Sequence, residues 1–357
     1  MIRISARTLL FLAAVLLILL AVIVPFRAGS RAAGPAVVTA LPVTMSRTGG
    51  ERFGHLLWRG GLVLDSPDPA FGGFSGLLLG VDGRDMLAVS DLGRWWRAQL
   101  IYDARGHLSG LRDPDGPWPV LSSRGAPLRG GWRDAEALAP WDGRRTGGPV
   151  LVGFERRERV ALYDWGGRGR KAKARYLFLP KAIGRGRRNG EMEGLARFWS
   201  GPRAGWLIAA AEKGFTPAGD VRAWTWRGRR VVPFAIRRKG EFRITDIAVL
   251  PSGRGFVTLE RRFRRSLAVL PAFAMRLFRT EDIARGAVLD GVDLMEASWP
   301  LHAIDNMEGL SVHRTGEELR LTVISDDNFN RSLQRTLLFQ FALPMKELER
   351  LLDGGKG

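Results

Sequence analysis

The sequence lacks cysteine and has little histidine. Without cysteine, the 357-residue chain can form no disulfide, no thiolate nucleophile, no iron–sulfur cluster and no cysteine-ligated zinc site. Its four histidines lie far apart along the chain, which also excludes a zinc site of the HExxH type. The folded part of the chain therefore depends on packing and backbone pairing.

Lysine is scarce, and arginine carries most of the positive charge. Only seven of the 55 basic residues are lysines, and the excess over 36 acidic residues gives a formal net charge of +19. The arginines are scattered instead of being gathered with stacking aromatic residues or on a recognition helix, which disfavours nucleic-acid binding. A basic surface that faces anionic lipid or a phosphorylated ligand fits this distribution better.

One uncharged apolar run stands out, from Leu9 to Phe26. Arg3 and Arg7 precede it and small residues follow it, as in an export signal. The run also reaches the length that spans a bilayer, so a retained anchor is an equal alternative. We expect residues 1–33 to be a signal peptide or membrane anchor, followed by a linker over residues 34–51. The protein is then exported to the periplasm, and it is associated with the inner membrane if the segment is retained.

Helical periodicity is rare in the rest of the chain. It occurs, weakly, only from Met345 to Leu352. From residue 37 onward, short β-branched or aromatic runs alternate with breaks rich in the 45 glycines and 19 prolines. This pattern predicts an all-β fold. It disfavours the α/β-hydrolase fold, and Ser75 lacks the G-x-S-x-G spacing of a serine nucleophile.

An internal repeat is the most informative feature. Residues 76, 137, 194, 247 and 309 occupy equivalent positions, at steps of 61, 57, 53 and 62 residues. Each is followed by a polar turn and then by a strand that ends in an acidic residue. A strand-rich repeat of this length indicates a propeller or an array of sheets.

Each repeat contains room for four strands, but the last repeat lacks its fourth. The stretch from Leu56 to Leu64 precedes the first repeat, and we expect it to pair with the last repeat and close the ring. The expected fold is a β-propeller of four-stranded blades over residues 52–343. We count five blades, or six if a long interval contains an irregular one. Residues 344–357 are expected to form a C-terminal tail with a short helix.

Hairpin geometry brings the repeated acidic residues together. The first two strands of a blade pair antiparallel, so the start of the first and the end of the second lie at the same end of the sheet. The first strand of each blade lines the central channel, and these acids should meet at one mouth of that channel. They are Glu136, Glu193, Asp246 and Glu308 at strand starts, and Asp91, Glu155, Glu212, Glu260 and Asp326 at strand ends.

Carboxylates gathered at one opening repel one another unless positive charge is present. A hard cation such as Ca²⁺, which prefers oxygen ligands, is one candidate, and the chain's own basic residues are another. The predicted Ca²⁺ ligands are Asp91, Glu136, Glu193, Asp246, Asp305, Asn306, Glu308, Asp326 and Asp327. The residues predicted to bind an anionic substrate are Arg94, Arg156, Lys213 and Arg261. The alternative is structural: each acid bonds a neighbouring blade's backbone or pairs with arginine.

Several motifs in order resemble a known family over residues 54 to 343. They are Phe74-Ser75-Gly76-Leu77, Asp134-Ala135-Glu136-Ala137-Leu138, Met192-Glu193-Gly194-Leu195, Leu259-Glu260-Arg261-Arg262-Phe263, Asp305-Asn306-Met307-Glu308-Gly309-Leu310 and Ser325-Asp326-Asp327-Asn328-Phe329. This combination resembles the exported phytase-like proteins, described as having esterase-like activity of phytase. The resemblance implies a propeller of the periplasm or cell surface with phosphoester or other ester hydrolase activity.

The resulting hypothesis is an exported hydrolase that acts on a phosphoester or another anionic ester at an acidic, metal-assisted mouth. Glu193 or Glu308 would orient or deprotonate the attacking water. The expected partner is a small anionic ester or phosphate, with no nucleic acid, and the chain is expected to be a monomer. Two alternatives stay open: a non-catalytic propeller that binds an envelope ligand or protein partner, and a calcium-dependent lactonase-like hydrolase.

Overall fold

The computed structural model describes residues 36–183, 192–262 and 270–354, and strands dominate these residues. The predicted signal or anchor segment, residues 1–33, lies outside them. Among the described residues, no helix combines the length and apolar character needed to cross a membrane. The C-terminal helix α3 (Met345–Leu352) forms where the weak helical periodicity predicts one.

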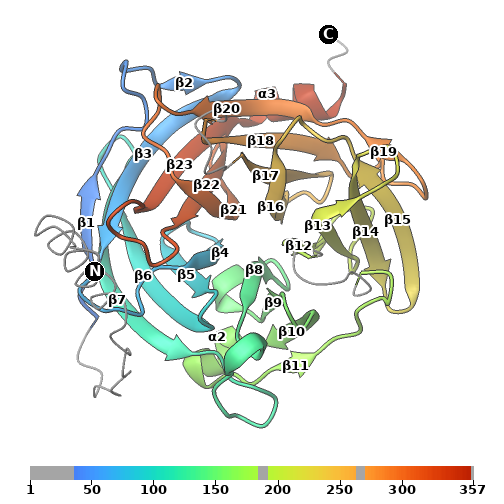
Figure 1. Cartoon of the computed structure of the whole chain (residues 1–357). Helices are drawn as coiled ribbons and strands as arrows, with labels where there is room; N and C mark the ends of the chain where they lie inside the picture. The colour runs from blue at the N-terminus through green and yellow to red at the C-terminus, as the bar shows by residue number, and fades with distance from the viewer. Residues whose placement is uncertain (1–35, 184–191, 263–269, 355–357) are drawn as a thin grey trace, which may run out of the picture. The chain divides into compact units, whose positions relative to one another are not determined.

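The innermost strands occupy the positions predicted for the first strand of each repeat. Figure 1 shows them gathered around a common centre. They are β4 (Phe74–Leu79), β8 (Ala135–Pro140), β12 (Gly194–Arg197), β16 (Arg243–Val249) and β21 (Asn306–Thr315). Each contacts the next in this order, and β21 contacts β4, so the inner strands form a closed ring.

Each inner strand begins an antiparallel sheet that runs outward. The second strands are β5 (Asp85–Ser90), β9 (Val150–Phe154), β13 (Leu207–Phe215), β17 (Gly255–Arg262) and β22 (Glu318–Asp326). The third strands are β6 (Arg94–Tyr102), β10 (Arg159–Tyr163), β14 (Val221–Arg227), β18 (Ala272–Arg279) and β23 (Thr336–Pro344). The outer strands are β7 (Leu108–Pro119), β11 (Arg175–Tyr176), β15 (Arg230–Ile236), β20 (Val292–Ser298) and β3 (Leu56–Asp65). This radial arrangement of antiparallel sheets is a β-propeller.

The outer strand β3 closes the ring, as the sequence predicts. It pairs antiparallel with β23, from Thr336 opposite Leu64 to Ala342 opposite Leu57. It also touches β7 through a parallel bridge between Gly60 and Leu108, which joins two blades into one continuous sheet. The first and last parts of the propeller are therefore held together by backbone pairing, and neither leaves an unpaired edge at the join.

Small residues let neighbouring inner strands approach closely. A Cβ atom at Gly76 would lie 2.7 Å from the Leu138 Cβ on the next inner strand, and one at Gly194 would lie 2.6 Å from Ile247 Cγ1. At Gly309 the backbone nitrogen of Leu77 would be 3.0 Å away. These three glycines are equivalent positions of the repeat, so the repeat encodes the spacing of strands around the axis.

Some elements differ from the predicted pattern. The fourth strand expected in the second repeat is short, since β11 spans only Arg175–Tyr176. The expected linker, residues 34–51, contains β1 (Thr39–Pro42), which pairs with β3. Two further short strands, β2 (Arg52–Phe53) and β19 (Val288–Leu289), extend the edges of sheets.

The packing of β3 against β23 yields a stability prediction. Trp58 is 8% exposed, and its ring lies 5.2 Å from the ring of Phe339 and 5.3 Å from that of Phe341. Trp58→Ala should lower the free energy of unfolding by about 3–5 kcal/mol, because it removes a large buried ring at the ring closure. Leu333→Ala is the control, since Leu333 is 82% exposed. Chemical denaturation that gives both variants the same midpoint would contradict this account of closure.

Candidate metal centre

A β-bulge lies near the start of most inner strands. The register shifts by one residue in β4, β8, β16 and β21. In β12, the N–H of Glu193 donates to Ala210 O, while Gly194 also pairs with Ala210. A bulge leaves one residue without a cross-strand partner and redirects its side chain. The extra residues in the four shifted strands are Ser75, Glu136, Thr245 and Glu308.

Three glutamates from three different blades meet at this end of the channel. Carboxylate oxygens of Glu136, Glu193 and Glu308 all lie within 4.8 Å of one another. Glu136 also belongs to a second group, with Asp134 and Glu155, that meets the same distance limit. The convergence inferred from hairpin geometry therefore holds for these residues, and these buried acidic groups can hold a metal ion.

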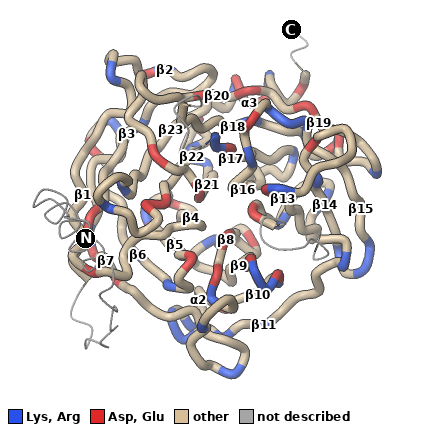
Figure 2. The backbone as a smooth tube through the Cα atoms, viewed as in Figure 1, with Lys and Arg blue, Asp and Glu red and all other residues tan. Residues whose placement is uncertain are grey.

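Further acids adjoin these glutamates. The charge of Glu308 acts on both Asp91 and Asp326, and the charge of Glu212 acts on Glu193. We call the whole set the carboxylate cluster: Asp91, Asp134, Glu136, Glu155, Glu193, Glu212, Glu308 and Asp326. Figure 2 shows acidic positions around the inner strands, with basic positions among them.

Burial and mutual repulsion disfavour ionisation within the carboxylate cluster. Burial raises the pKa of Glu136 and of Glu193 well above the usual range, and the negative charges of neighbouring glutamates raise both further. Burial also raises the pKa of Glu308, although Arg261 and a hydrogen bond from Asn306 oppose the rise. For Asp91, burial and the charge of Asp134 raise the pKa to about 7. A cation bound here would relieve this repulsion.

Arg261 is the cation placed most deeply in the carboxylate cluster. Its Nη2 lies 3.1 Å from Glu308 Oε1 and 3.6 Å from Glu212 Oε1, and its Nη1 donates to Asn306 Oδ1 at 2.5 Å. Burial lowers the pKa of Arg261, but the charges of Glu308, Glu212 and Glu193 outweigh this effect and raise it. The guanidinium therefore stays protonated and neutralises part of the cluster.

The other predicted substrate-binding residues lie at the edge of the cluster. Arg156 Nε is 2.8 Å from Asp134 Oδ2, and Lys213 Nζ is 2.5 Å from Glu212 Oε2. Both side chains are about half exposed and reachable from solvent. Arg94 differs, because its side chain forms no ion pair or hydrogen bond with any residue in the described part of the chain.

Asp246, a predicted metal ligand, connects two inner strands. Its Oδ1 accepts from Ile247 N at 2.8 Å, and its Oδ2 accepts from Leu310 N on β21 at 2.7 Å. Both oxygens are therefore engaged by backbone. Ser75, the bulged residue of β4, in turn donates to Ala135 O on the next inner strand. These two positions match the structural alternative: they tie neighbouring blades together.

Asp305 and Asp327, two more predicted ligands, organise turns. Asp305 accepts from the backbone N–H groups of Asn306 and Arg335. Asp327 accepts from Gly73 N at 3.0 Å and from Phe329 N at 3.1 Å, which joins the last repeat to the first.

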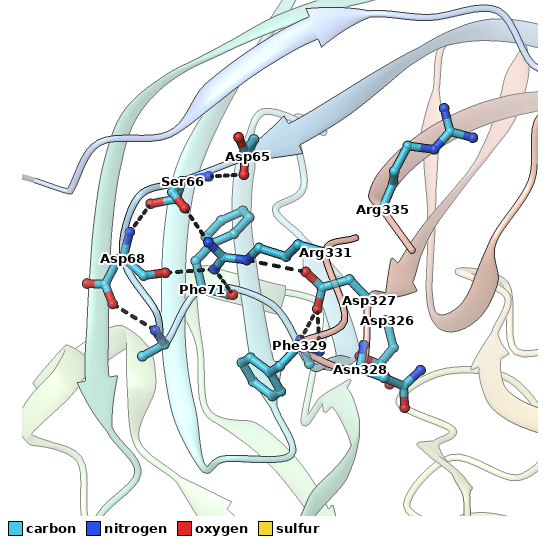
Figure 3. Close-up of polar contacts among 12 residues, drawn as sticks. Asp65, Ser66, Asp68, Phe71, Asp326, Asp327, Asn328, Phe329, Arg331 and Arg335 are labelled. Atoms are coloured by element: carbon cyan, nitrogen blue, oxygen red, sulfur yellow. Dashed lines mark hydrogen bonds and ion pairs between the residues drawn. The ribbon is translucent and has the colours of Figure 1, made fainter. Parts of the chain in front are cut away.

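Figure 3 shows the turn around Asp327 docked by Arg331, which donates to the carbonyl oxygens of Ser66, Asp68 and Phe71. Asp326 differs from Asp327. One of its oxygens accepts from Asn328 N, and its carboxylate interacts with Glu308 and Asp91 in the carboxylate cluster. Asp326, at the end of β22, therefore belongs to the carboxylate cluster. Asp327, the next residue, connects the last repeat to the first.

Two residues depart from the sequence-based picture of the mouth. Glu260, expected there, is 1% exposed and forms an ion pair with Arg276 Nε at 2.7 Å. Asp134, not among the predicted ligands, lies within the cluster beside Glu136. The signal for Asp134 was its spacing, because it precedes Glu136 by two residues as Asn306, a predicted ligand, precedes Glu308.

Residues 69–329 match a single family model, "Phytase-like: Esterase-like activity of phytase". No curated protein matches the chain. Among solved structures, similar folds include a chain of the nidogen/laminin complex, at 11% identity and TM-score 0.38, covering 84% of this chain and 97% of that one. The phage phi92 endosialidase follows at 10% identity and TM-score 0.39, with coverage of 90% and 60%. The β-propeller domain of Cps50 (Swd1) from Myceliophteria thermophila has 9% identity and TM-score 0.36, with coverage of 85% and 99%.

The raised pKa values predict how pH affects the metal-free protein. Because the pKa values of Glu136 and Glu193 are higher in the folded chain than the usual value of 4.5, folding binds protons. The resulting stability is present in full below about pH 4.5 and is lost as pH rises through the folded-state values. In chelator, Glu193→Gln should therefore be more stable than the unmodified protein at pH 8. The same difference in stability should be smaller at pH 5. Glu317→Gln, at an 83% exposed side chain, is the control. An equal effect of Glu193→Gln at both pH values in denaturant titrations would contradict the repulsion.

The role of Asp246 gives a separate prediction. Asp246→Asn should lower the free energy of unfolding by about 1–3 kcal/mol, because an amide cannot accept from both Ile247 N and Leu310 N. Bound metal per chain, measured by elemental analysis, should not change. A loss of metal without a loss of stability would instead make Asp246 a ligand.

Proposed function

Because the chain belongs to the phytase-like family, we propose that it hydrolyses an anionic ester, preferably a phosphoester, at the carboxylate cluster with the help of a divalent cation. The observation that carries the proposal is the meeting of Glu136, Glu193 and Glu308 within 4.8 Å. Clustered, buried titratable groups with strongly shifted pKa values are typical of functional sites.

The donor set fits a hard cation, and Ca²⁺ is the ion proposed. Glu136 and Glu193 accept no side-chain hydrogen bond from any described residue, so their oxygens are available as ligands. Glu308 accepts from Asn306 Nδ2 at 2.7 Å and keeps a fixed orientation. Carboxylate oxygens in this number suit Ca²⁺. When bound, the ion would neutralise part of the cluster and polarise the ester.

Basic residues within the cluster and at its edge would bind the substrate's anionic group. Arg261 presents a planar guanidinium of the kind that grips phosphate oxygens, and it already lies 3.1 Å from Glu308. Lys213 and Arg156 are half exposed beside it and can add point charges from the solvent side. The combination of a metal ion and guanidinium groups favours a phosphoester over a neutral ester.

Glu193 is the better candidate for the general base. Glu308 is engaged by Arg261 and Asn306, whereas Glu193 has no such partner among the described residues. In the proposed reaction, a water oxygen attacks the phosphorus while Glu193 takes one proton of that water. The bond between phosphorus and the ester oxygen breaks, and Glu193 passes the proton to the ester oxygen, which departs as an alcohol. A carboxyl group whose pKa lies above the usual range is suited to this proton transfer near neutral pH.

A five-bladed propeller and an exported chain complete the proposal. The closed ring of inner strands supports the count of five blades. Export, or anchoring at the inner membrane of the periplasm, rests on the basic residues and apolar run within residues 1–33. A monomer is proposed because the ring closes within one chain.

The proposal predicts a specific loss of activity. Glu193→Gln should reduce turnover of a phosphomonoester such as p-nitrophenyl phosphate by about 100-fold or more, as expected for a lost general base. Chelator should abolish turnover in the unmodified protein, and Ca²⁺ should restore it. Glu317→Gln is the matched control and should keep full activity. Turnover that survives both chelator and Glu193→Gln would eliminate this mechanism.

A non-catalytic Ca²⁺-binding propeller is the second candidate. The observation that favours it is the network around Glu308, in which Arg261 and Asn306 already satisfy the carboxylate, as in a structural site. Stoichiometric Ca²⁺ binding with no turnover across phosphoesters, carboxylic esters and lactones would support it. Turnover of lactones alone would instead identify the lactonase-like alternative.

A further inference from the structure

The inner strands enclose a second polar region at the other end of the channel. A small cavity there is lined by residues of β4, β8, β12, β16 and β21, together with Arg145. Along β8, Pro140 at this cavity is four residues beyond Glu136, or roughly 13 Å at the usual strand rise. The channel thus carries the carboxylate cluster at one end and arginine at the other.

Arg145 is a buried cation with no acidic partner. It is 5% exposed and follows β8 in a short 3-10 turn (Arg145–Gly147). Its Nε donates to Leu79 O at 2.6 Å and its Nη2 to Ser311 Oγ at 2.8 Å. In the described part of the chain, no carboxylate forms an ion pair with it. Its backbone has a φ of 55°, a left-handed conformation unusual for arginine, so the fold holds this residue in place at some cost.

Two other groups at the cavity are donors without acceptors. Arg197 also lines the cavity, and its buried Nε has no hydrogen-bond partner. Ser311 Oγ accepts from Leu79 N and from Arg145, so its own proton remains to be donated. No described residue accepts that proton. Most of the cavity lining is apolar, and the charged and hydroxyl side chains in it are N–H and O–H donors, the reverse of the carboxylate cluster.

The nearby charges reinforce this positive character. Burial lowers the pKa of Arg145 to about 10, which leaves it charged at neutral pH. Burial, Arg145 and Arg320 together lower the pKa of His313 to about 3. Two nearby acids have other partners: Asp142 pairs with Arg144, and Asp82, whose charge acts on His313, accepts from Arg84 N. A buried charge without a counter-charge is strongly unfavourable.

We propose that this end of the channel binds a small monovalent anion, a halide, between Arg145, Arg197 and Ser311. The centre of a water-sized sphere has about 20 Å³ of room there, which is enough for one bound water or a monoatomic ion. Phosphate does not fit such a volume. A halide at this place would accept hydrogen bonds from the unpaired donors of Arg145, Arg197 and Ser311. It would also supply the negative charge that Arg145 lacks.

A purely bracing role is the simpler alternative. In that case Arg145 ties β4 to β21 through Leu79 and Ser311, and stability does not depend on which anion is present. The two accounts predict different effects on the melting temperature when one anion replaces another at constant ionic strength. An anion that binds only the folded state raises the melting temperature. If Arg145 only braces the strands, the melting temperature does not depend on which anion is present.

The test compares thermal melting of the purified full chain in sodium chloride, bromide, methanesulfonate and phosphate at equal ionic strength. Chloride and bromide should raise the melting temperature by about 3 °C or more over methanesulfonate, as binding well above the dissociation constant implies. Crystals grown with bromide should show an anomalous peak within hydrogen-bond reach of Arg145 Nη1 or Nη2.

Variants locate the effect. Arg197→Gln and Ser311→Ala should each shrink the halide-dependent shift, and Arg145→Gln should remove it. Arg144→Gln is the matched control: its side chain is 67% exposed and pairs with Asp142, and the shift should persist. If Arg145→Gln does not fold, the other two variants and the anomalous peak still decide the matter. Equal melting in all four salts, or stabilisation by phosphate alone, would overturn the proposal.

Discussion

The close approach of the inner strands around one axis is the constraint on which the rest of the structure depends. Glycine at positions 76, 194 and 309 leaves room for the neighbouring inner strand, since a Cβ atom at any of them would lie about 3 Å or less from its neighbours. In three repeats a glutamate, Glu136, Glu193 or Glu308, immediately precedes the small residue. The same packing that closes the ring therefore forces acidic side chains from separate blades into one small volume.

That crowding determines the chemistry available at the mouth. Glu136, Glu193 and Glu308 are disfavoured as anions by burial and by one another, and Arg261 compensates only part of their charge. In the proposed function, a divalent cation would complete the balance and would polarise an ester. At the other end of the channel, Arg145 is a buried positive charge with no carboxylate partner among the described residues. We therefore propose a cation at the acidic end of the channel and an anion at the end that holds Arg145.

Much of this arrangement could be predicted from the sequence, because repeated motifs indicate that the same local structure recurs. The spacing of residues 76, 137, 194, 247 and 309 predicted the inner strands, and the position of Leu56 to Leu64 predicted the ring closure that β3 and β23 form. Antiparallel pairing predicted that Glu136, Glu193 and Glu308 would meet. These features follow from strand direction and period alone.

Other features depended on contacts that no period reveals. The repeat aligns Asp246 with Glu136, but the bulged residue of β16 is Thr245. Asp246 therefore takes the position of Ala137, and its carboxylate accepts from Leu310 N instead of joining the cluster. In β17, Arg261 and not Glu260 takes the position that Asp326 holds in β22, since Arg243 pairs with Arg261 as Asn306 pairs with Asp326. Glu260 lies one residue earlier in the strand and pairs with Arg276. Arg145 lies in a turn outside every repeated motif, so only the folded chain shows its position over the channel.

The most direct test of the central claim is calorimetric titration of the metal-stripped protein with Ca²⁺ in two buffers of different ionisation enthalpy. We predict one ion bound per chain, with protons released on binding near pH 7, because carboxyl groups of raised pKa must ionise to become ligands. Binding with no proton release, or no binding at all, would contradict a crowded and partly protonated carboxylate cluster at the mouth of the channel.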